Sequence, residues 1–388
     1  MSQQHNYRSP WMDTDLDMYR ETARRFIAED ITPHQERFVK QQHVDRQAWD
    51  KAGALGLLLA DIPEQYGGGG GNFAHTAVFM EELAWAGDYG FGISVHAIAS
   101  NYILHKGTEA QKKKYLPQMA AGKMIGAIAM TEPGAGSDLQ GVRTRAELRG
   151  DTYVVNGSKI FISNGSMADL VVLVVKTNPD AGGKGMSLLL LETQGAEGFK
   201  VGRILDKLGQ KSADTSELFF DNVRVPAANL LGGEEGQGFG QLMHELPYER
   251  TLCALSAIAS TEQALALALA YTRERMAFGK PLFEQQNTRF KLAEVKAQAM
   301  VGRSFVDNCV QRMVAGTMDA DTAAMAKLWT TENLGKAVDE CLQLHGGYGY
   351  MLEYPIARLY ADARVQRIYG GASEIMKEII ARSLARQP

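Results

Sequence analysis

The sequence has few cysteines and no long apolar run. Its three thiols lack the spacing of a disulfide framework or a metal site, so we expect free cysteines in a reducing compartment: Cys253, Cys309 and Cys341. The longest apolar runs, Leu170–Val175 and Met186–Leu191, fall well short of the roughly 18 residues that cross a membrane. We therefore expect no membrane span.

An excess of positive charge is also missing. The 388 residues include 41 Lys and Arg against 45 Asp and Glu, a formal net charge of −4, which argues against a nucleic-acid partner. The stretch Met1–Trp11 is polar and lacks the apolar core of a secretory signal. Hydrophobic residues make up 45% of the chain, enough to bury a large core. At roughly 150 residues per domain, the length predicts two or three domains.

Several common enzyme motifs are absent. The sequence contains no Rossmann fingerprint and no nucleophile elbow, and Gly182–Gly185 lacks the spacing and the hydroxyl residue of a P-loop. His244-Glu245 begins like the helical zinc motif, but Tyr248 stands where its second histidine belongs. The sequence therefore predicts no metal site.

Apolar spacing divides the chain into three parts. Helical periodicity predicts a fifth helix between Thr108 and Gly122, after four others. Those four span Asp13–Ala28, Gln47–Leu59, Ala74–Ala86 and Phe91–His105. Short β-branched runs follow, separated by turn residues such as Asn156-Gly157, which is typical of antiparallel strands. These strands are expected at Ile125–Met130, Thr152–Asn156, Lys159–Ser163, Leu170–Lys176 and Met186–Glu192.

Long helical patterns return in the third part and predict a four-helix bundle. They span His244–Met276, Gln286–Gly316, Asp319–Leu344 and Ser373–Arg386. We expect an α+β fold with three domains: a helical domain at 1–124, a β-barrel at 125–236 and a helical bundle at 237–388.

Two glycine-containing segments in the β part could bind a cofactor. Thr131–Asp138 follows a strand and exposes backbone N–H groups and hydroxyls, so it could hold a phosphate or the polar edge of a flavin. An ordinary surface turn is the alternative. Phe161–Gly165 offers an aromatic ring beside a hydroxyl, which suits a planar cofactor but also a plain strand end.

Three further segments lie in the C-terminal part. Arg275–Pro281, with Gln286 beyond it, could present a guanidinium to a phosphate, although an arginine also stabilises a helix C-terminus. The glycines of Gln343–Tyr350 allow a ligand to approach the backbone closely. Those of Tyr369–Glu374 leave space just before a helix start.

Together and in this order, the five segments resemble the acyl-CoA dehydrogenase family. Ala129–Gly141 and Gln343–Asp362 match its two characteristic patterns, and the resemblance covers nearly the whole chain. Glu245–Arg250 and Tyr369–Arg382 are similar to the long-chain acyl-CoA dehydrogenase branch. The resemblance implies an N-terminal helical domain, a central antiparallel β-domain, a C-terminal four-helix bundle, one FAD per subunit and a homotetramer.

The resemblance also implies which residues bind FAD. Those at the flavin ring would be Met130, Thr131, Phe161, Ile162 and Ser163. Ser137 would lie near the phosphates of FAD and CoA. Residues holding the FAD of a neighbouring subunit would be Arg275, Phe278, Gln286, Gln343, Leu344, His345, Gly346 and Gly347. The remaining FAD contacts would be Ile128, Gly136, Ala372, Ser373 and Glu374.

The family reaction oxidises the bond between the α and β carbons of an acyl-CoA thioester. A carboxylate takes the α-proton, and the β-hydrogen leaves as hydride to the flavin. Many relatives carry this glutamate where the present chain has Gly370, but the long-chain and isovaleryl branches carry it just before an arginine, as in Leu246–Arg250. The resemblance therefore implies Glu249 as the base, with a pKa raised in a water-poor site, and the Gly370 N–H as a donor to the thioester carbonyl.

The remaining expectations concern the substrate and the partners. The residues implied to contact the substrate are Ser137, Tyr248, Arg250, Gly370 and Gly371. Without the resemblance, Glu249 and Arg250 would be taken as a surface ion pair at a helix start. Electron-transfer flavoprotein is the implied electron acceptor. An acyl-CoA oxidase on the same scaffold and a catalytically silent member remain alternatives. The expected location is bacterial cytoplasm or mitochondrial matrix.

Overall fold

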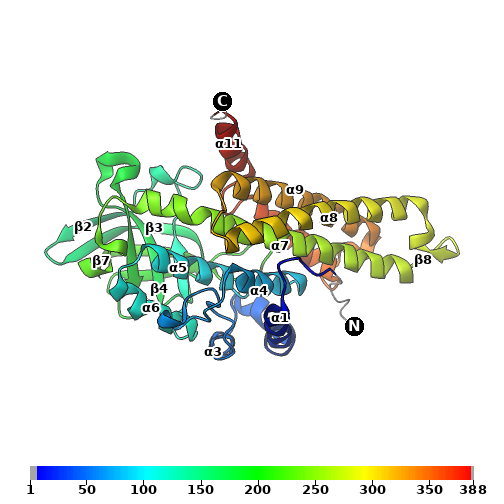
Figure 1. Cartoon of the computed structure of the whole chain (residues 1–388), viewed down its shortest axis with the longest axis horizontal. Helices are drawn as coiled ribbons and strands as arrows, with labels where there is room; N and C mark the ends of the chain where they lie inside the picture. The colour runs from blue at the N-terminus through cyan, green and yellow to red at the C-terminus, as the bar shows by residue number, and fades with distance from the viewer. Residues whose placement is uncertain (1–6, 386–388) are drawn as a thin grey trace.

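The computed structural model describes residues 7–385. Residues 1–6 of the polar stretch Met1–Trp11 and the predicted helix end at Arg386 lie outside the described residues. The order is helical, then β, then helical, as the sequence predicts. The long C-terminal helices run along the longest axis, away from the sheet (Figure 1).

The described N-terminal part contains six α-helices, three of which begin at a capping side chain. They are α1 Thr14–Phe26, α2 Gln35–Gln41, α3 Arg46–Ala54, α4 Phe73–Trp85, α5 Ile93–Lys106 and α6 Glu109–Ala120. Asp13 accepts a hydrogen bond from the Leu16 N–H at 2.9 Å, and Thr108 forms a capping box with Gln111. Helix α3 ends earlier than the predicted Leu59, because Gly56 adopts a φ of +68° that turns the chain.

The central part is one seven-stranded sheet. Its strands are β1 Gly126–Ala129, β2 Arg145–Arg149, β3 Thr152–Ser163, β4 Leu170–Lys176, β5 Met186–Glu192, β6 Phe199–Ile204 and β7 Thr215–Pro226. The pairing order is β1-β4-β2-β3-β7-β6, with β5 paired to β4. Every residue of β4 is buried, which agrees with its unbroken apolar run.

Two details of the sheet differ from the sequence prediction. Asn156-Gly157 is not a turn, because β3 continues through it as a single strand with a register shift between Val155 and Gly157. Asn222 on the partner strand supports this bulge, since its N–H donates to the Asn156 side chain at 2.9 Å. The sheet is also not purely antiparallel, since β1 and β2 each pair with β4 in parallel.

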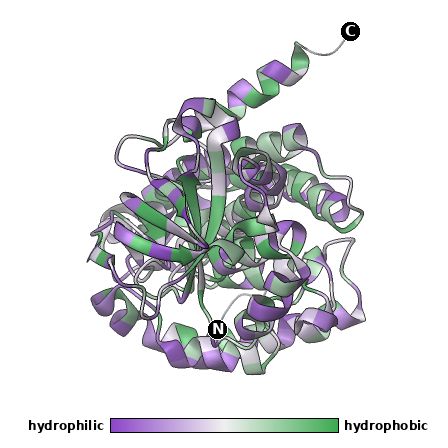
Figure 2. Cartoon of the chain, turned by 90° about the vertical axis from the view of Figure 1, so that its left-hand side faces the viewer, coloured by the Kyte–Doolittle hydropathy of each residue, from purple (hydrophilic) through white to green (hydrophobic). Residues whose placement is uncertain are grey.

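Three long helices dominate the C-terminal part, with shorter helices around them. The elements are α7 Gly238–Glu274, β8 Met276–Ala277, β9 Lys280–Pro281, α8 Gln286–Val314, α9 Ala320–Leu344, α10 Pro355–Ala363 and α11 Ser373–Leu384. Helix α10, which the sequence analysis missed, packs against α7 and α9. Helix α11 contacts α9 and projects from the body (Figures 1 and 2).

Helix α7 joins the two helical parts through the core. In the described chain, it is the one helix long and apolar enough to cross a membrane by length and composition, yet 61% of its apolar window is buried inside the protein. It packs against α4, α5, α8 and α9. This burial is typical of a core helix.

The three cysteines are free, and two of them, Cys309 and Cys341, are buried.

An ionic group lies inside the helical core. Arg303 of α8 is 1% exposed and pairs with Glu81 of α4 and with Glu262 of α7, the latter at 2.6 Å. Arg20 of α1 also contacts Glu81, at 3.2 Å. These ion pairs connect the N-terminal helices to the C-terminal bundle.

Candidate active site

Glu249 lies within α7 with its side chain inside the protein. It is 8% exposed, and the hydroxyl of Tyr102 on α5 donates a hydrogen bond to its Oε1 at 3.0 Å. The residue is therefore buried and is not part of a surface ion pair with Arg250. Pro247, two residues earlier, has no N–H for the helix, and its carbonyl accepts the hydroxyl of Thr251 at 2.7 Å.

The surroundings of Glu249 make its carboxylate a better base. Burial raises the pKa of Glu249 to about 7, while the Tyr102 hydrogen bond and the charge of Arg250 oppose this rise. The nearby carboxylate of Glu245 raises the pKa further. A pKa near neutrality lets one carboxylate accept and release a proton at physiological pH.

The Gly370-Gly371 segment lies beside this part of α7. The Arg250 Nε donates to the Gly370 carbonyl at 3.4 Å. A Cβ on Gly370 would lie 3.2 Å from the Cys253 Sγ, and one on Gly371 would lie 2.6 Å from the Met376 Cε. Both glycines have positive φ, +64° and +98°, so a side chain here would be strained as well as crowded.

Lys327 of α9 holds the same segment from the other side. Its side chain is fully buried, and its Nζ donates to the Gly371 carbonyl at 2.6 Å. Burial lowers the pKa of Lys327, whereas the nearby Cys253 thiol raises it. The backbone at residues 370 and 371 is thus fixed by two cationic side chains, one from α7 and one from α9.

The other residues predicted at the substrate are less closely grouped. Tyr248 is buried, and its hydroxyl donates to Asp61 at 2.9 Å, so it faces the N-terminal helices. Ser137 is exposed in the loop after β1. Of the predicted substrate residues, Arg250, Gly370 and Gly371 are the ones with close contacts near Glu249.

The two predicted flavin segments of the sheet lie together. The Ile160 N–H donates to the Thr131 carbonyl at 2.9 Å, which joins the end of β1 to β3. Phe161 is 63% exposed and has a φ of +61°, whereas Ile162 is buried. An exposed aromatic side chain in a strained conformation indicates a binding surface. Ile128, Met130 and Ser163 are half-buried at the same strand ends.

A buried ion pair supports this surface. Lys159 lies on β3, and its Nζ donates to the Met130 carbonyl at 3.0 Å and to Glu132 at 2.8 Å. Burial lowers the pKa of Lys159 to about 8, and the charge of Glu132 opposes this. The Glu132 carboxylate also accepts the N–H groups of Arg143 and Thr144. Gly136, in the same loop, has open space where a Cβ would point.

The second predicted cofactor group forms a separate cluster. The imidazole of His345 stacks on Tyr271 with ring centres 4.3 Å apart, and the Arg275 guanidinium lies 5.7 Å from the Tyr348 ring centre. Phe278 is 95% exposed, with a φ of +53°. Gln286, Gln343, Gly346 and Gly347 are also exposed, and Leu344 is half-buried. This cluster surrounds β8, at the far end of the molecule from β2 and β3 (Figure 1).

The segment Ala372–Glu374 belongs to neither cofactor cluster by its contacts. It follows the two glycines directly and begins α11. The Ser373 hydroxyl donates to Glu332 at 2.6 Å, so it is already bonded within the chain. Glu374 is exposed and Ala372 is half-buried.

Sequence reasoning missed Tyr102 and Lys327. Tyr102 lies 147 residues from Glu249, and nothing in its local pattern distinguishes it from a core tyrosine. Lys327 had a signal: it interrupts a buried stripe of small residues on α9 that includes Ala323, Ala324 and Thr331. A lysine in such a stripe indicates a specific partner, because a buried charge is costly without one.

Three family models together cover almost the whole chain. They are the acyl-CoA dehydrogenase N-terminal domain at residues 13–123, the middle domain at 127–223 and the C-terminal domain at 236–385. The chain is 50% identical to the mouse long-chain specific acyl-CoA dehydrogenase, mitochondrial, over 96% of this chain and 86% of that protein.

Solved structures show the same relationship. The crystal structure of an acyl-CoA dehydrogenase from Geobacillus kaustophilus matches 97% of this chain and all of its own, with 43% identity and a TM-score of 0.95. A glutaryl-CoA dehydrogenase from Mycobacterium smegmatis in complex with FADH2 matches 97% of this chain and 96% of its own, at 30% identity and a TM-score of 0.90. The resemblance found in the sequence is confirmed: the chain belongs to the acyl-CoA dehydrogenase family of FAD-dependent oxidoreductases.

Proposed function

We propose that this protein converts a long-chain acyl-CoA thioester to the trans-2-enoyl-CoA, with Glu249 as the base. The observation that carries the proposal is a buried carboxylate of raised pKa, one helical turn from Cys253 and beside the Gly370-Gly371 segment. The α-proton of a thioester is weakly acidic, so its removal requires a well-placed base and hydrogen-bond donors to the carbonyl oxygen. We assign the Gly370 N–H to that oxygen, in a segment held by Arg250 and Lys327.

The exposed residues of the two clusters fit FAD. The ring of Phe161 offers an apolar surface to a planar group, and the open space at Gly136 suits phosphates. When bound, FAD would accept the β-hydrogen as hydride. The segment that carries Arg275, Phe278 and Gln286 surrounds β8, and β8 lies at the opposite end of the molecule from β3, which carries Phe161 (Figure 1). We therefore assign these three residues to a neighbouring subunit's cofactor.

A relative supports the proposed substrate class, and the family resemblance supports the proposed electron acceptor. A long-chain acyl group is proposed because the mouse relative at 50% identity is named for long-chain substrates. Electron-transfer flavoprotein is the proposed acceptor and a tetramer the proposed assembly. Bacterial cytoplasm or mitochondrial matrix is the proposed location.

The direct test is an anaerobic titration of the purified holoenzyme with acyl-CoA thioesters of increasing chain length, including branched ones. Loss of flavin absorbance with the long chains would support the proposal. No loss with any thioester, while FAD stays bound, would overturn it. Peroxide formed from oxygen at the rate of turnover would instead indicate an acyl-CoA oxidase.

A prediction concerns Tyr102 and the pH dependence. The base must be ionised, so kcat/KM should fall as the pH decreases through the raised pKa of Glu249, about 7. In Tyr102→Phe the hydrogen bond that lowers this pKa is gone, and the fall should move upward by about one pH unit. Stopped-flow flavin reduction between pH 6 and 9 measures both profiles.

A matched control exists for that variant. Tyr115 on α6 is also buried, and its hydroxyl also donates to a carboxylate, that of Glu192 at 2.9 Å. Tyr115→Phe should leave the pH profile in place. If Tyr102→Phe gives the same profile as Tyr115→Phe, Tyr102 does not position the base.

A further inference from the structure

Two histidines and a glutamate meet between α5 and the start of α7. The Nδ1 of His105 lies 3.0 and 3.1 Å from the two carboxylate oxygens of Glu245, and the Nδ1 of His244 lies 2.8 Å from one of them. All three groups offer a ligand atom within 4.8 Å of the others. The side chain of Glu245 is 2% exposed, whereas those of His105 and His244 are 40% and 57% exposed.

The charge of Glu245 has no permanent counter-charge nearby. Among residues 7–385, only the two imidazoles are within ion-pair distance of this carboxylate; no lysine or arginine is. A carboxylate this deeply buried is costly unless a cation or strong donors compensate it. A bound cation would supply this compensation at any pH at which the imidazoles are neutral.

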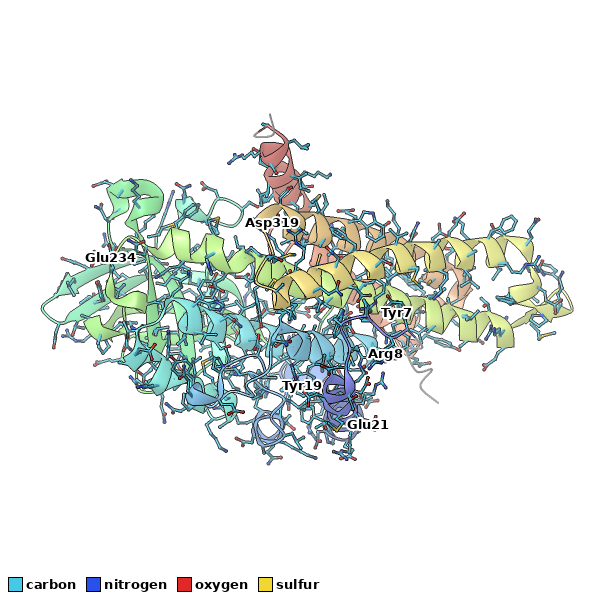
Figure 3. The ribbon with its side chains drawn as sticks, in the orientation of Figure 1. Tyr7, Arg8, Tyr19, Glu21, Glu234 and Asp319 are labelled. Carbon is cyan, nitrogen blue, oxygen red and sulfur yellow. The ribbon has the colours of Figure 1, made fainter. Side chains whose placement is uncertain are left out.

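In the part of the chain that the structure describes, a buried oxygen without a hydrogen bond lies on the same helix as Glu245. Gln241, one turn before Glu245 on α7, is 9% exposed, and within the described chain its Oε1 accepts no hydrogen bond. Its Nε2 donates to the Leu231 carbonyl at 3.2 Å, which fixes the amide. Gln241 and His105 line a cavity of about 350 Å³. Glu234, which is labelled in Figure 3, lines the same cavity.

We propose that His105, His244 and Glu245 bind one divalent transition-metal ion of the Zn²⁺ type, beside the cavity that His105 and Gln241 line. Two imidazole nitrogens with one carboxylate oxygen favour Zn²⁺ and its neighbours over Mg²⁺ or Ca²⁺, which prefer oxygen ligands. The half-exposed imidazoles give the ion a route from solvent.

The distances suit such an ion after small rotations. Bonds of about 2.0–2.1 Å in a tetrahedron place ligand atoms about 3.4 Å apart. The observed separations from His105 and His244 to Glu245 are 2.8–3.1 Å, a few tenths of an ångström short of that value, and all three ligand atoms lie within 4.8 Å of one another.

This site also explains why the sequence predicts no metal. The helical zinc motif requires its second histidine four residues after the first, and Tyr248 occupies that position. The fold supplies the second imidazole from α5 instead, 140 residues from Glu245. The ion would connect α5 to α7, the helices that carry Tyr102 and Glu249, without taking part in the reaction.

The test uses chelator-treated holoenzyme titrated with Zn²⁺ by calorimetry. We expect one ion per subunit, a higher Tm in its presence, and binding at least about tenfold weaker in His105→Gln and in His244→Gln. His34→Gln changes a histidine just before α2 that is not part of the cluster, and this variant should bind Zn²⁺ as the unchanged protein does. Both test positions are half-exposed, so these variants should keep their fold, which FAD content and circular dichroism check.

Co²⁺ in place of Zn²⁺ identifies the ligands. Visible bands of tetrahedral Co²⁺ that weaken in His105→Gln and His244→Gln would support the site. A thiolate charge-transfer band would overturn it, because it would place the ion on a cysteine. Equal Zn²⁺ affinity in the two histidine variants, or no saturable binding, would also overturn it.

Discussion

The Glu249→Gln variant should bind acyl-CoA but reduce its flavin roughly 100- to 10,000-fold more slowly than the unchanged enzyme. Glutamine has the same shape and can still accept the Tyr102 hydroxyl, but it cannot take the α-proton. Because the amide preserves the packing of this buried position, FAD content and substrate affinity should stay close to normal. Single-turnover flavin reduction under anaerobic conditions separates the proton-removal step from binding.

A second glutamate on α7 provides the control. Glu274 is exposed at the C-terminal end of the helix, so Glu274→Gln changes the same residue type on the same element far from Glu249. It should reduce its flavin at the normal rate. If Glu249→Gln also does so, another group removes the α-proton, although membership of the family would be unaffected.

The Arg303→Leu variant should lose about 3–5 kcal/mol of stability. Removal of the guanidinium takes away the partner that Glu81 and Glu262 share in the core, while Arg20 still contacts Glu81. Burial already raises the pKa of Glu81, and the charge of Arg303 opposes that rise. The pKa of Glu81 should therefore increase in the variant, so the deficit should shrink at lower pH, where the carboxyl becomes neutral.

The thermal midpoint of the holoenzyme at pH 8 and at pH 5.5 measures this effect. Arg382→Leu, which removes an exposed i,i+4 pair with Glu378, should change stability by at most about 0.5 kcal/mol. Adding Glu81→Gln and Glu262→Gln to Arg303→Leu should restore much of the loss, since the two carboxylates that Arg303 neutralises are then replaced by uncharged amides. An unchanged Tm in Arg303→Leu alone would show that Arg303 does not stabilise the protein by neutralising these carboxylates.

Local signals in the sequence predict most of the fold. The predicted helix start at Thr108 is confirmed, because its side chain bonds to the first turn of α6. The structure adds a second cap of this kind at Asp319. The prediction of a turn at Asn156-Gly157 is wrong for a physical reason, because the same dipeptide suits both a hairpin turn and a bulge. The partner strand, with Asn222, decides in favour of the bulge.

The candidate site is less predictable than the fold. Its central residue, Glu249, was assigned through resemblance, because a Glu-Arg pair on a helix is ordinarily a solvated pair. Its burial depends on α5 packing across α7, and the contact with Tyr102 joins residues that are distant in sequence. Contacts of this kind follow from helix packing, which local periodicity does not determine.

The separation of the two cofactor clusters has a genetic consequence. Under the proposed arrangement, each FAD takes Phe161 and Glu249 from one chain and Arg275 from another. In a mixed dimer, a chain defective only at Glu249 and a chain defective only at Arg275 would place both defects in one site and leave the other intact. Two inactive alleles could therefore restore part of the activity when expressed together, whereas each alone would not.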